Sequence, residues 1–256
     1  TETVCSDEAV NYDLQANIDA INVLPSEFTY TVATSDVAVP AGADRGAASD
    51  ANIIDSYTNT TGAPVDITYT ITPISDDGCT GTDFTYTVTV NPEPVGSNAA
   101  ETVCSDEALN YDLQANIDAI NVLPSVFTYA VATSDGAVPA AADRMVASDA
   151  NITDTYTNTT GAPVDITYTI TPISDDGCTG SVFTYTVTVN PEPVGSNEAI
   201  TVCSDEALNY DLQANIDAIN VLPSLFTYTV TSSDQANVPA GADRGLATAD
   251  NITDSY

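Results

Sequence analysis

Apolar and polar residues alternate along two neighbouring stretches of the chain, residues 65–72 and 84–91. In each stretch every second residue is apolar and most of the others are Thr; the apolar ones are Val65, Ile67, Tyr69 and Ile71, then Phe84, Tyr86, Val88 and Val90. An alternation with period two predicts β-strands with one buried face. The sequence SDDGCTG between them favours a turn, so we expect an antiparallel hairpin with Cys79 at its tip. Pro73 is expected to end the first strand, and Pro92 with Pro94 the second.

The residues before this hairpin contain shorter forms of the same pattern. Alternation predicts strands at residues 9–16, 28–36 and 52–61. Residues 18–26 are expected to form a loop or a single helical turn, and the polar, Gly- and Ala-rich residues 39–51 to cross between strands. Short strands at this spacing, separated by Gly, Pro, Asn and Asp, are typical of an antiparallel β-sandwich of immunoglobulin-like size.

The whole pattern repeats along the chain. The motif TVCSDEA places Cys5, Cys104 and Cys203 at equal spacing, since 104 − 5 and 203 − 104 both equal 99. Cys79 and Cys178, each in the motif DDGC, are also 99 residues apart. A fixed period predicts a tandem array. The expected fold class is therefore all-β, with tandem immunoglobulin-like antiparallel β-sandwich repeats of 99 residues.

The array divides into residues 1–95, 96–194 and 195–256, which we call units 1, 2 and 3. Unit 3 lacks a copy of the last hairpin, because the sequence ends at Tyr256, which aligns with Tyr57. Two explanations stay open: the chain is part of a longer one, or another molecule supplies the missing strands, as in strand-donating filaments. Between units, the prolines of NPEPVGSN predict a semi-rigid exit and its GSN a short hinge, so we expect a string of beads.

The cysteines are expected to form one disulfide inside each complete unit. In an immunoglobulin-like sandwich the amino-terminal pole and the tip of the last hairpin are expected at the same end, which pairs Cys5 with Cys79 and Cys104 with Cys178. Pairing Cys79 with Cys104 instead would require strand 84–91 and the linker to fold back over about 20 Å, beyond the reach of a disulfide. Reduced cysteines are a further alternative, disfavoured because both positions lie in polar turns. Disulfides imply an oxidising, extracytoplasmic location.

Composition narrows the choice of partners. The chain carries 37 Asp and Glu against three Arg, with no Lys or His, for a net charge of −34. Such a surface repels nucleic acid and anionic membranes, which bind cationic patches, and it suits the binding of divalent cations. No apolar run approaches the roughly 18 residues of a membrane span, so we expect no membrane insertion of this segment.

Carboxylates near the cysteines are candidate calcium ligands, because Ca²⁺ takes about six to eight oxygen ligands. The expected disulfides would gather these carboxylates at one pole of each unit, and a calcium ion there would stiffen the junction between units. The candidates are Asp7, Glu8, Asp76, Asp77, Glu93, Asp106, Glu107, Asp175 and Asp176. The chain has no EF-hand or cadherin-type ligand sequence, so a solvated acidic pole is the alternative. No other cofactor is expected.

Few residues of the chain are suited to catalysis. Without His or Lys there is no usual acid–base or Schiff-base residue, and the cysteines are expected to be paired. Carboxylate pairs such as Asp76 and Asp77 lie on a predicted loop tip with no apolar pocket around them. We therefore expect no enzymatic activity. Arg45 follows Asp44, and a local ion pair is expected there.

Three motifs carry a resemblance to a known family: VCSDEALNYDLQ, then TNTTGAPVDITYTITPISDDGC, then FTYTVTVNPEP. In this order they resemble the PKD-like, immunoglobulin-like repeats of very large surface and secreted proteins of Bacteroidota, including gliding-type adhesins. The resemblance covers both complete units and the partial third. Members of that family usually serve as spacers or adhesive stalks, so the resemblance implies a structural region at the cell surface. It carries over no catalytic residue.

Together these features predict a non-enzymatic, extracellular repeat region that acts as an adhesin stalk or as the body of a surface filament. Its partners would be neighbouring copies of the same chain and a surface ligand whose identity the sequence does not give. The alternatives are a strand-exchanging filament subunit and a module that binds calcium or surface glycans. A glycan site would show exposed aromatic residues on loops, whereas Tyr and Phe fall mostly at inward strand positions.

Overall fold

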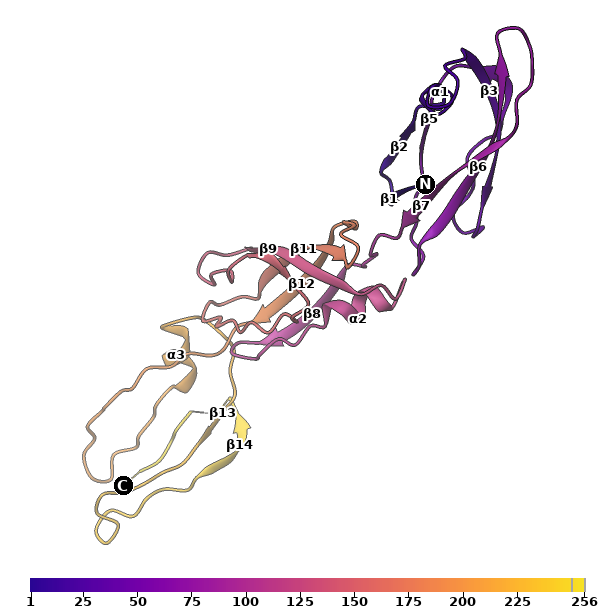
Figure 1. Cartoon of the computed structure of the whole chain (residues 1–256). Coiled ribbons are helices and arrows are strands. Elements are labelled where there is room, and N and C mark those ends of the chain that lie inside the picture. Colours follow the sequence, from indigo (N-terminus) through magenta and orange to yellow (C-terminus); the bar gives the residue numbers. More distant parts are fainter. Residues whose placement is uncertain (250, 256) are drawn as a thin grey trace.

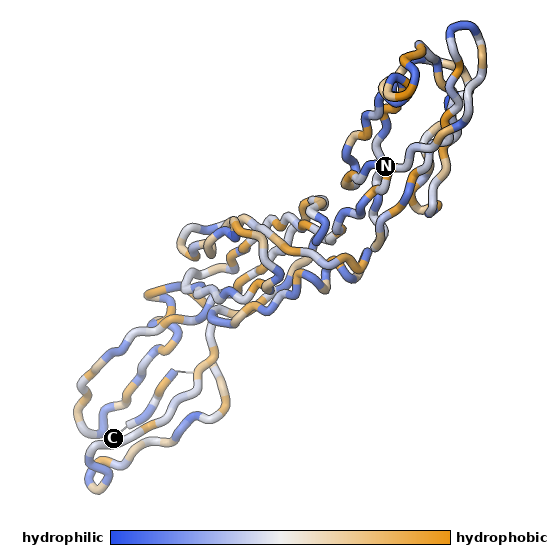
Figure 2. The backbone as a smooth tube through the Cα atoms, in the orientation of Figure 1, coloured by the Kyte–Doolittle hydropathy of each residue, from blue (hydrophilic) through white to orange (hydrophobic). Residues whose placement is uncertain are grey.

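The computed structural model describes residues 1–249 and 251–255. It shows three units that follow one another in an elongated row, with units 1 and 3 at opposite ends (Figure 1). Units 1 and 2 are all-β, as predicted, and hydrophobic and hydrophilic residues alternate along their strands (Figure 2). Tyr256, on which the alignment of unit 3 was based, lies outside the described residues.

Unit 1 is built from two sheets and one short helix. Its elements are β1 (Glu2–Cys5), β2 (Ala9–Tyr12), α1 (Leu14–Asp19), β3 (Ser26–Thr34), β4 (Arg45–Ser49), β5 (Ile53–Ser56), β6 (Val65–Ser75) and β7 (Phe84–Asn91). One sheet has the order β1-β7-β6-β3-β4, and β2 pairs with β5 in the other. The apolar faces of the two sheets meet in one buried core, which makes the unit a sandwich.

Unit 2 repeats this arrangement, and unit 3 repeats part of it. Unit 2 contains β8 (Ala99–Cys104), α2 (Leu113–Asp118), β9 (Ser125–Thr133), β10 (Arg144–Ser148), β11 (Val164–Ser174) and β12 (Phe183–Asn190). Its main sheet has the order β10-β9-β11-β12-β8. The described part of unit 3 contains α3 (Leu212–Asp217), β13 (Phe226–Tyr228) and β14 (Arg244–Thr248).

The predicted hairpin is present as β6 and β7, paired antiparallel from Val65 opposite Val90 to Ile71 opposite Phe84. The prediction that Pro73 ends the first strand is wrong, because β6 continues to Ser75. The backbone N–H and C=O of a strand residue point to the same side, and the Pro73 carbonyl accepts from Gly81 N–H at 2.8 Å. The missing N–H of Pro73 therefore faces the loop at the hairpin tip, so the ladder with β3 keeps its bonds.

The predicted strand over residues 9–16 is only half strand. β2 ends at Tyr12, and α1 begins at Leu14, inside the range expected to be extended. The carboxylate of Asp13 accepts the Ala16 N–H at 3.0 Å and so caps the helix. A capping aspartate thus outweighs an alternation of only a few residues.

Two strands, β1 and β4, were not predicted. β4 lies inside the supposed crossover at residues 39–51 and pairs irregularly with β3. It brings the Arg45 guanidinium over the ring of Tyr30, at 4.6 Å from the ring centre. The guanidinium donates to the Ala51 and Asn52 carbonyls at 2.6 and 2.9 Å. The expected local ion pair with Asp44 is therefore replaced by a clamp on the backbone that leads into β5.

A chain of hydroxyl groups crosses the core of each complete unit. In unit 2 the Tyr168 hydroxyl donates to Asp154 at 2.7 Å and lies 2.6 Å from the Tyr156 hydroxyl. Burial, followed by the hydrogen bond to Asp154, raises the pKa of Tyr168 well above its usual range. The phenol therefore stays protonated and able to donate at any pH at which the fold is stable.

We expect Tyr168→Phe to lower the free energy of unfolding of unit 2 by about 1–3 kcal/mol, because it removes the hydroxyl that donates to the Asp154 carboxylate and contacts the Tyr156 hydroxyl. The thermal unfolding midpoint of the full chain measures the loss. Thr169→Ala, at the adjacent exposed position of β11, is the control and should change stability by less than about 0.5 kcal/mol. Equal effects of the two substitutions would contradict a structural role for the hydroxyl chain.

Candidate functional site at the junction between repeats

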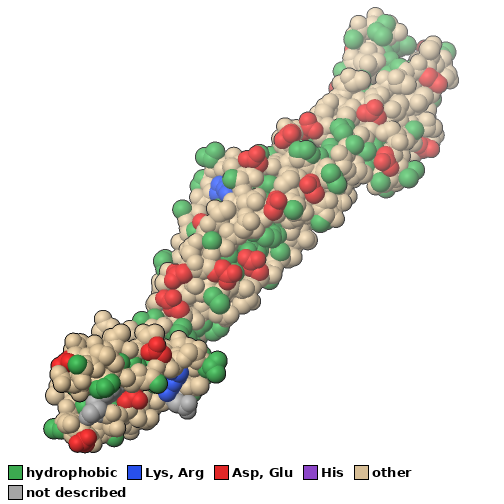
Figure 3. Space-filling view, turned by 90° about the horizontal axis from the view of Figure 1, so that it is seen from below, with side chains coloured by type: hydrophobic (Ala, Val, Ile, Leu, Met, Phe, Trp, Pro, Cys, Tyr) green, Lys and Arg blue, Asp and Glu red, His purple; other side chains and the backbone are tan. Residues whose placement is uncertain are grey.

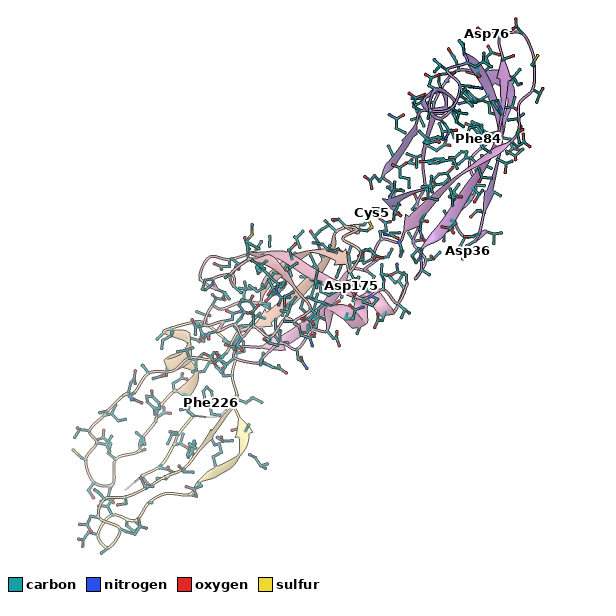
Figure 4. The ribbon with its side chains drawn as sticks, in the orientation of Figure 1. Cys5, Asp36, Asp76, Phe84, Asp175 and Phe226 are labelled. Atoms are coloured by element: carbon teal, nitrogen blue, oxygen red, sulfur yellow. A yellow bond between two sulfur atoms is a disulfide. The ribbon has the colours of Figure 1, made fainter. Side chains whose placement is uncertain are left out.

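A disulfide joins unit 1 to unit 2. Cys5 and Cys178 are bonded, with their Cα atoms 5.4 Å apart and a sequence separation of 173 (Figure 4). The expected pairs inside units, Cys5 with Cys79 and Cys104 with Cys178, are therefore wrong. Cys79, Cys104 and Cys203 are free and exposed. The bridge links the VCS motif of one unit to the hairpin tip of the next, a pairing that was not among the alternatives considered.

The direction of β1 explains this pairing. β1 runs parallel to β7 and places Cys5 opposite Asn91, at the end of β7 where the chain leaves the unit. The tip of the β6–β7 hairpin lies at the other end of the same strands, and Figure 4 shows Cys5 and Asp76 at opposite ends of unit 1. The β7 strand alone spans 8 residues, or about 26 Å at the usual rise. A bridge from Cys5 to Cys79 is therefore beyond disulfide reach.

The linker after β7 is packed into the junction. Pro92, Glu93 and Pro94 are buried, in contrast to the exposed, hinged linker expected for a string of beads. Glu93 N–H donates to the carbonyl of Asn59 at 3.0 Å. The Asn59 side chain, itself fully buried, donates to Val90 O at 2.8 Å and so fixes the start of the linker to unit 1.

Asn121 of unit 2 holds the linker from the other side. Its side-chain amide donates to Glu93 O at 2.8 Å and to Thr61 O of unit 1 at 3.4 Å. Its side-chain oxygen accepts the Val95 N–H at 3.3 Å. One asparagine therefore contacts the linker twice and the preceding unit once, using both the donor and the acceptor of its amide.

Two glycines allow the units to approach closely. A Cβ atom at Gly180, beside the hairpin tip of unit 2, would lie 1.9 Å from the Pro94 carbonyl oxygen. A Cβ atom at Gly62 of unit 1 would lie 2.6 Å from the Asn121 carbonyl oxygen. Both distances are far below van der Waals contact with backbone atoms, so a larger residue at either position would push the units apart.

The junction between units 2 and 3 repeats the asparagine contacts, but its linker is not covered by a hairpin tip. Asn220 donates to Glu192 O at 2.6 Å and to Thr160 O at 3.4 Å, as Asn121 does at the first junction. The linker residues there, Pro191 and Pro193, are more exposed than Pro92 and Pro94. The difference lies in the last hairpin of the unit: its tip covers the linker at the first junction, and the described residues of unit 3 contain no copy of that hairpin.

A family model for the PKD-like domain matches residues 2–94 and 101–193, which is most of the chain. The chain belongs to the PKD-like domain family. The predicted resemblance to PKD-like repeats and the predicted fold class are both confirmed, and membership suggests a structural or adhesion-type repeat module. No curated protein matches the chain.

Several solved structures match this PKD-like chain at low sequence identity and low TM-score. The chicken CNTN1 FN1-FN3 domains are 14% identical with a TM-score of 0.28, over 97% of this chain and 86% of theirs. Fibronectin(III)-like modules of CbhA from Clostridium thermocellum are 7% identical with a TM-score of 0.22, over 78% of this chain and 95% of theirs. Among the described residues, no helix is long and apolar enough to cross a bilayer.

The acidic residues predicted to form a calcium site do not gather. Acidic side chains are spread over the face of the PKD-like units seen in Figure 3, and the described residues contain no group of three or more metal-binding side chains. Within each unit the candidates lie at opposite ends: Asp7, Glu8, Glu93, Asp106 and Glu107 at the exit ends, and Asp76, Asp77, Asp175 and Asp176 at the hairpin tips of the entry ends. The first junction brings the exit end of unit 1 to the tip of unit 2, but the described residues there form no group of three or more metal-binding side chains. Local bonds also occupy them: Glu8 accepts the Cys5 N–H at 3.0 Å, and Asp7 accepts the Thr58 hydroxyl at 2.5 Å.

Sequence reasoning missed the residues that build the junction. Asn121 and Asn220 lie in the motif INVLPS, for which the sequence predicted only a loop or a single helical turn, although the motif recurs in every unit. Gly180 lies two residues after a cysteine in a turn sequence, where glycine needs no further explanation. Asn59 begins an N-x-T triplet, but its burial and two hydrogen bonds identify it as a structural residue.

We expect Asn121→Ala to loosen the junction by about 1–3 kcal/mol, because the linker then loses its amide partners on the unit 2 side. Faster hydrogen exchange at the Val95 amide and a broader distribution of particle lengths in small-angle X-ray scattering would report this. Asn22→Ala, at the equivalent exposed position of unit 1, is the matched control and should leave both measurements unchanged. Unchanged exchange at Val95 in Asn121→Ala would contradict the role assigned to this residue.

The junction should weaken as pH rises, because burial, and then the negative charge of Asp7, raises the pKa of Glu93. A carboxyl group with a raised pKa binds its proton more tightly in the folded protein, so stability falls between the ordinary carboxyl pKa and the raised one. Glu93→Gln should therefore melt at a higher temperature than the unmodified chain at neutral pH, with the difference closing as pH falls through this window. Glu192→Gln, in the more exposed second linker, should show less of this effect.

Proposed function

We propose that the chain is a tension-bearing spacer of an extracellular surface protein, in the manner of an adhesin stalk or the body of a surface filament. The observation that carries this proposal is the Cys5–Cys178 bridge across the junction. A disulfide requires an oxidising compartment, which supports a location outside the cytoplasm. PKD-like modules are typically structural, which supports a non-enzymatic role.

The bridge changes the route that a stretching force would take. Tension applied at the two ends of the chain reaches Cys5, crosses the sulfur atoms to Cys178 and continues towards the carboxyl end. The 172 residues between the two cysteines (178 − 5 − 1) do not lie on this route. Most of unit 1 and most of unit 2 are thereby protected from being pulled out as extended chain.

The packed linker supports the same function. A spacer must hold its units in a line, and a flexible linker between like-charged units would leave their orientation to chance. Here the linker is bonded to unit 1 through Asn59 and to unit 2 through Asn121. The same two contacts recur at the second junction through Asn158 and Asn220. Repetition of one junction geometry is what a straight or regularly twisted stalk requires.

Single-molecule stretching between handles at residues 1 and 256 tests the proposal. With the bridge intact, the 84 residues outside it (256 − 172) should extend to about 300 Å at full length. Reduction should add about 600 Å, the contour length of the enclosed residues. Cys5→Ser should behave as the reduced chain does, because it cannot form the bridge.

Cys79→Ser is the control, because Cys79 is free and should not change the extension. The proposal fails if the unreduced chain already extends to the length of the reduced one, since the units would then unravel under load. It fails also if the force needed to extend the chain is unchanged by the bridge.

A further inference from the structure

Unit 3 has the frame of a complete unit without its hairpin. Asp211 caps α3 by accepting the Ala214 N–H at 3.0 Å, as Asp112 caps α2. Gln213 accepts the Ser224 N–H at 2.9 Å, and Arg244 lies over Tyr228 at 4.7 Å. The unit is also docked on unit 2 through Asn220. What it presents is therefore a formed surface at a fixed place in the row.

The frame of unit 3 exposes apolar residues that are buried in unit 2. Val238 is 47% exposed, whereas its equivalent in unit 2, Val138, is 1% exposed. A groove in unit 3, which we call its open side, is lined by the apolar residues Ile200, Leu208 and Ile252 and by Tyr210, with Ser196, Asn197 and Glu198 beside them. In unit 2 the position of Tyr210 is taken by Tyr111, which stacks on Tyr185 of β12 at 3.8 Å between ring centres. The second strand of the hairpin is thus the element that fills this groove in a complete unit.

Residues 198–203 also differ from their equivalents in unit 2. Their equivalents in unit 2 form β8, which pairs only with β12. In unit 3 the described residues 198–203 form no strand, and none of the described strands pairs with them. A hairpin arriving on the open side would supply that partner.

Cys104 lies at the edge of the same site. Its N–H donates to Glu107 at 3.0 Å, and Ser105 N–H donates to Asn190 O at 3.0 Å. Cys5 is held in the same way at the end of unit 1, and there it bonds to the hairpin tip of the following unit. Cys104 is exposed and free at the equivalent place.

We propose that the open side of unit 3 is a docking site for a β-hairpin of the PKD-like type, and that Cys104, not Cys203, forms a disulfide with the cysteine at the tip of that hairpin. The occupant is defined by its chemistry: two strands with alternating apolar residues, joined by a turn that carries a cysteine, as in β11 and β12. This site does not depend on whether the chain bears load.

The covalent step is a thiol–disulfide exchange. The Cys104 thiol loses its proton to solvent, and its thiolate attacks the tip sulfur of a hairpin that enters as a mixed disulfide with a small thiol. The new bond forms between Cys104 and the tip cysteine, the bond to the small thiol breaks, and the small thiol leaves as a thiolate that takes up a proton. No net oxidation occurs, because the incoming disulfide supplies the oxidising equivalent.

A synthetic peptide tests the proposal on the unmodified chain. The peptide has the sequence of residues 164–193, with its one cysteine carried as the mixed disulfide with glutathione. We expect the adduct at Cys104 to form about tenfold or more faster than at Cys79 or Cys203, because docking raises the local concentration of the tip cysteine. Peptide mapping without reduction identifies the site, and hydrogen exchange should show new protection at residues 198–203.

Matched variants separate docking from simple thiol reactivity. Cys104→Ser should abolish the fast adduct, and Cys203→Ser should leave it unchanged. A peptide of the same composition with scrambled strands should label the three exposed cysteines at similar rates. The proposal is overturned if the fast adduct forms at Cys203 or Cys79, or if the scrambled peptide labels Cys104 as quickly. It is overturned too if chains pair through their open sides and exclude the peptide, which size-exclusion chromatography would show.

Discussion

The parallel pairing of the first strand with the last is the constraint on which the rest of the structure depends. β1 lies beside β7 and runs in the same direction, so the VCS motif is carried to the end where the chain leaves the unit. The hairpin tip lies at the opposite end, where the preceding unit in the row adjoins. A cysteine at each of these two positions can meet only across a junction. Had β1 run antiparallel to β7, the same cysteines would have closed each unit on itself.

Besides the disulfide, a few buried polar groups hold the junction. The side-chain amide of Asn121 donates hydrogen bonds to carbonyls of the linker and of a unit 1 loop, which would be costly to bury without a partner. Its side-chain oxygen accepts a hydrogen bond from a linker N–H. Glycines at Gly62 and Gly180 let the backbones come close enough for these bonds to form. Because hydrogen bonds are directional, this arrangement fixes the angle between units as well as their separation.

Electrostatics make such a junction necessary. The chain has a net charge of −34, so neighbouring units repel one another at short range. Within unit 1, burial and then the negative charge of Asp7 raise the pKa of Glu93. The disulfide and the asparagine contacts offset this repulsion at the point of contact, while repulsion elsewhere favours an extended row. Solubility and straightness then follow from the same surface charge.

The amino-acid sequence by itself determined the repeat, the all-β class and the main hairpin, because these depend on local alternation and turn residues that act over a few positions. Alternation alone predicted a strand across Asp13, whereas this residue caps a short helix. Only the tertiary structure decided the disulfide partners, the packed linker and the place of the acidic residues. Each of these depends on whether β1 is parallel or antiparallel to β7, and an alternation of apolar residues is identical in both directions. The physical reason is that side-chain periodicity specifies which face of a strand is buried but not which way the strand runs.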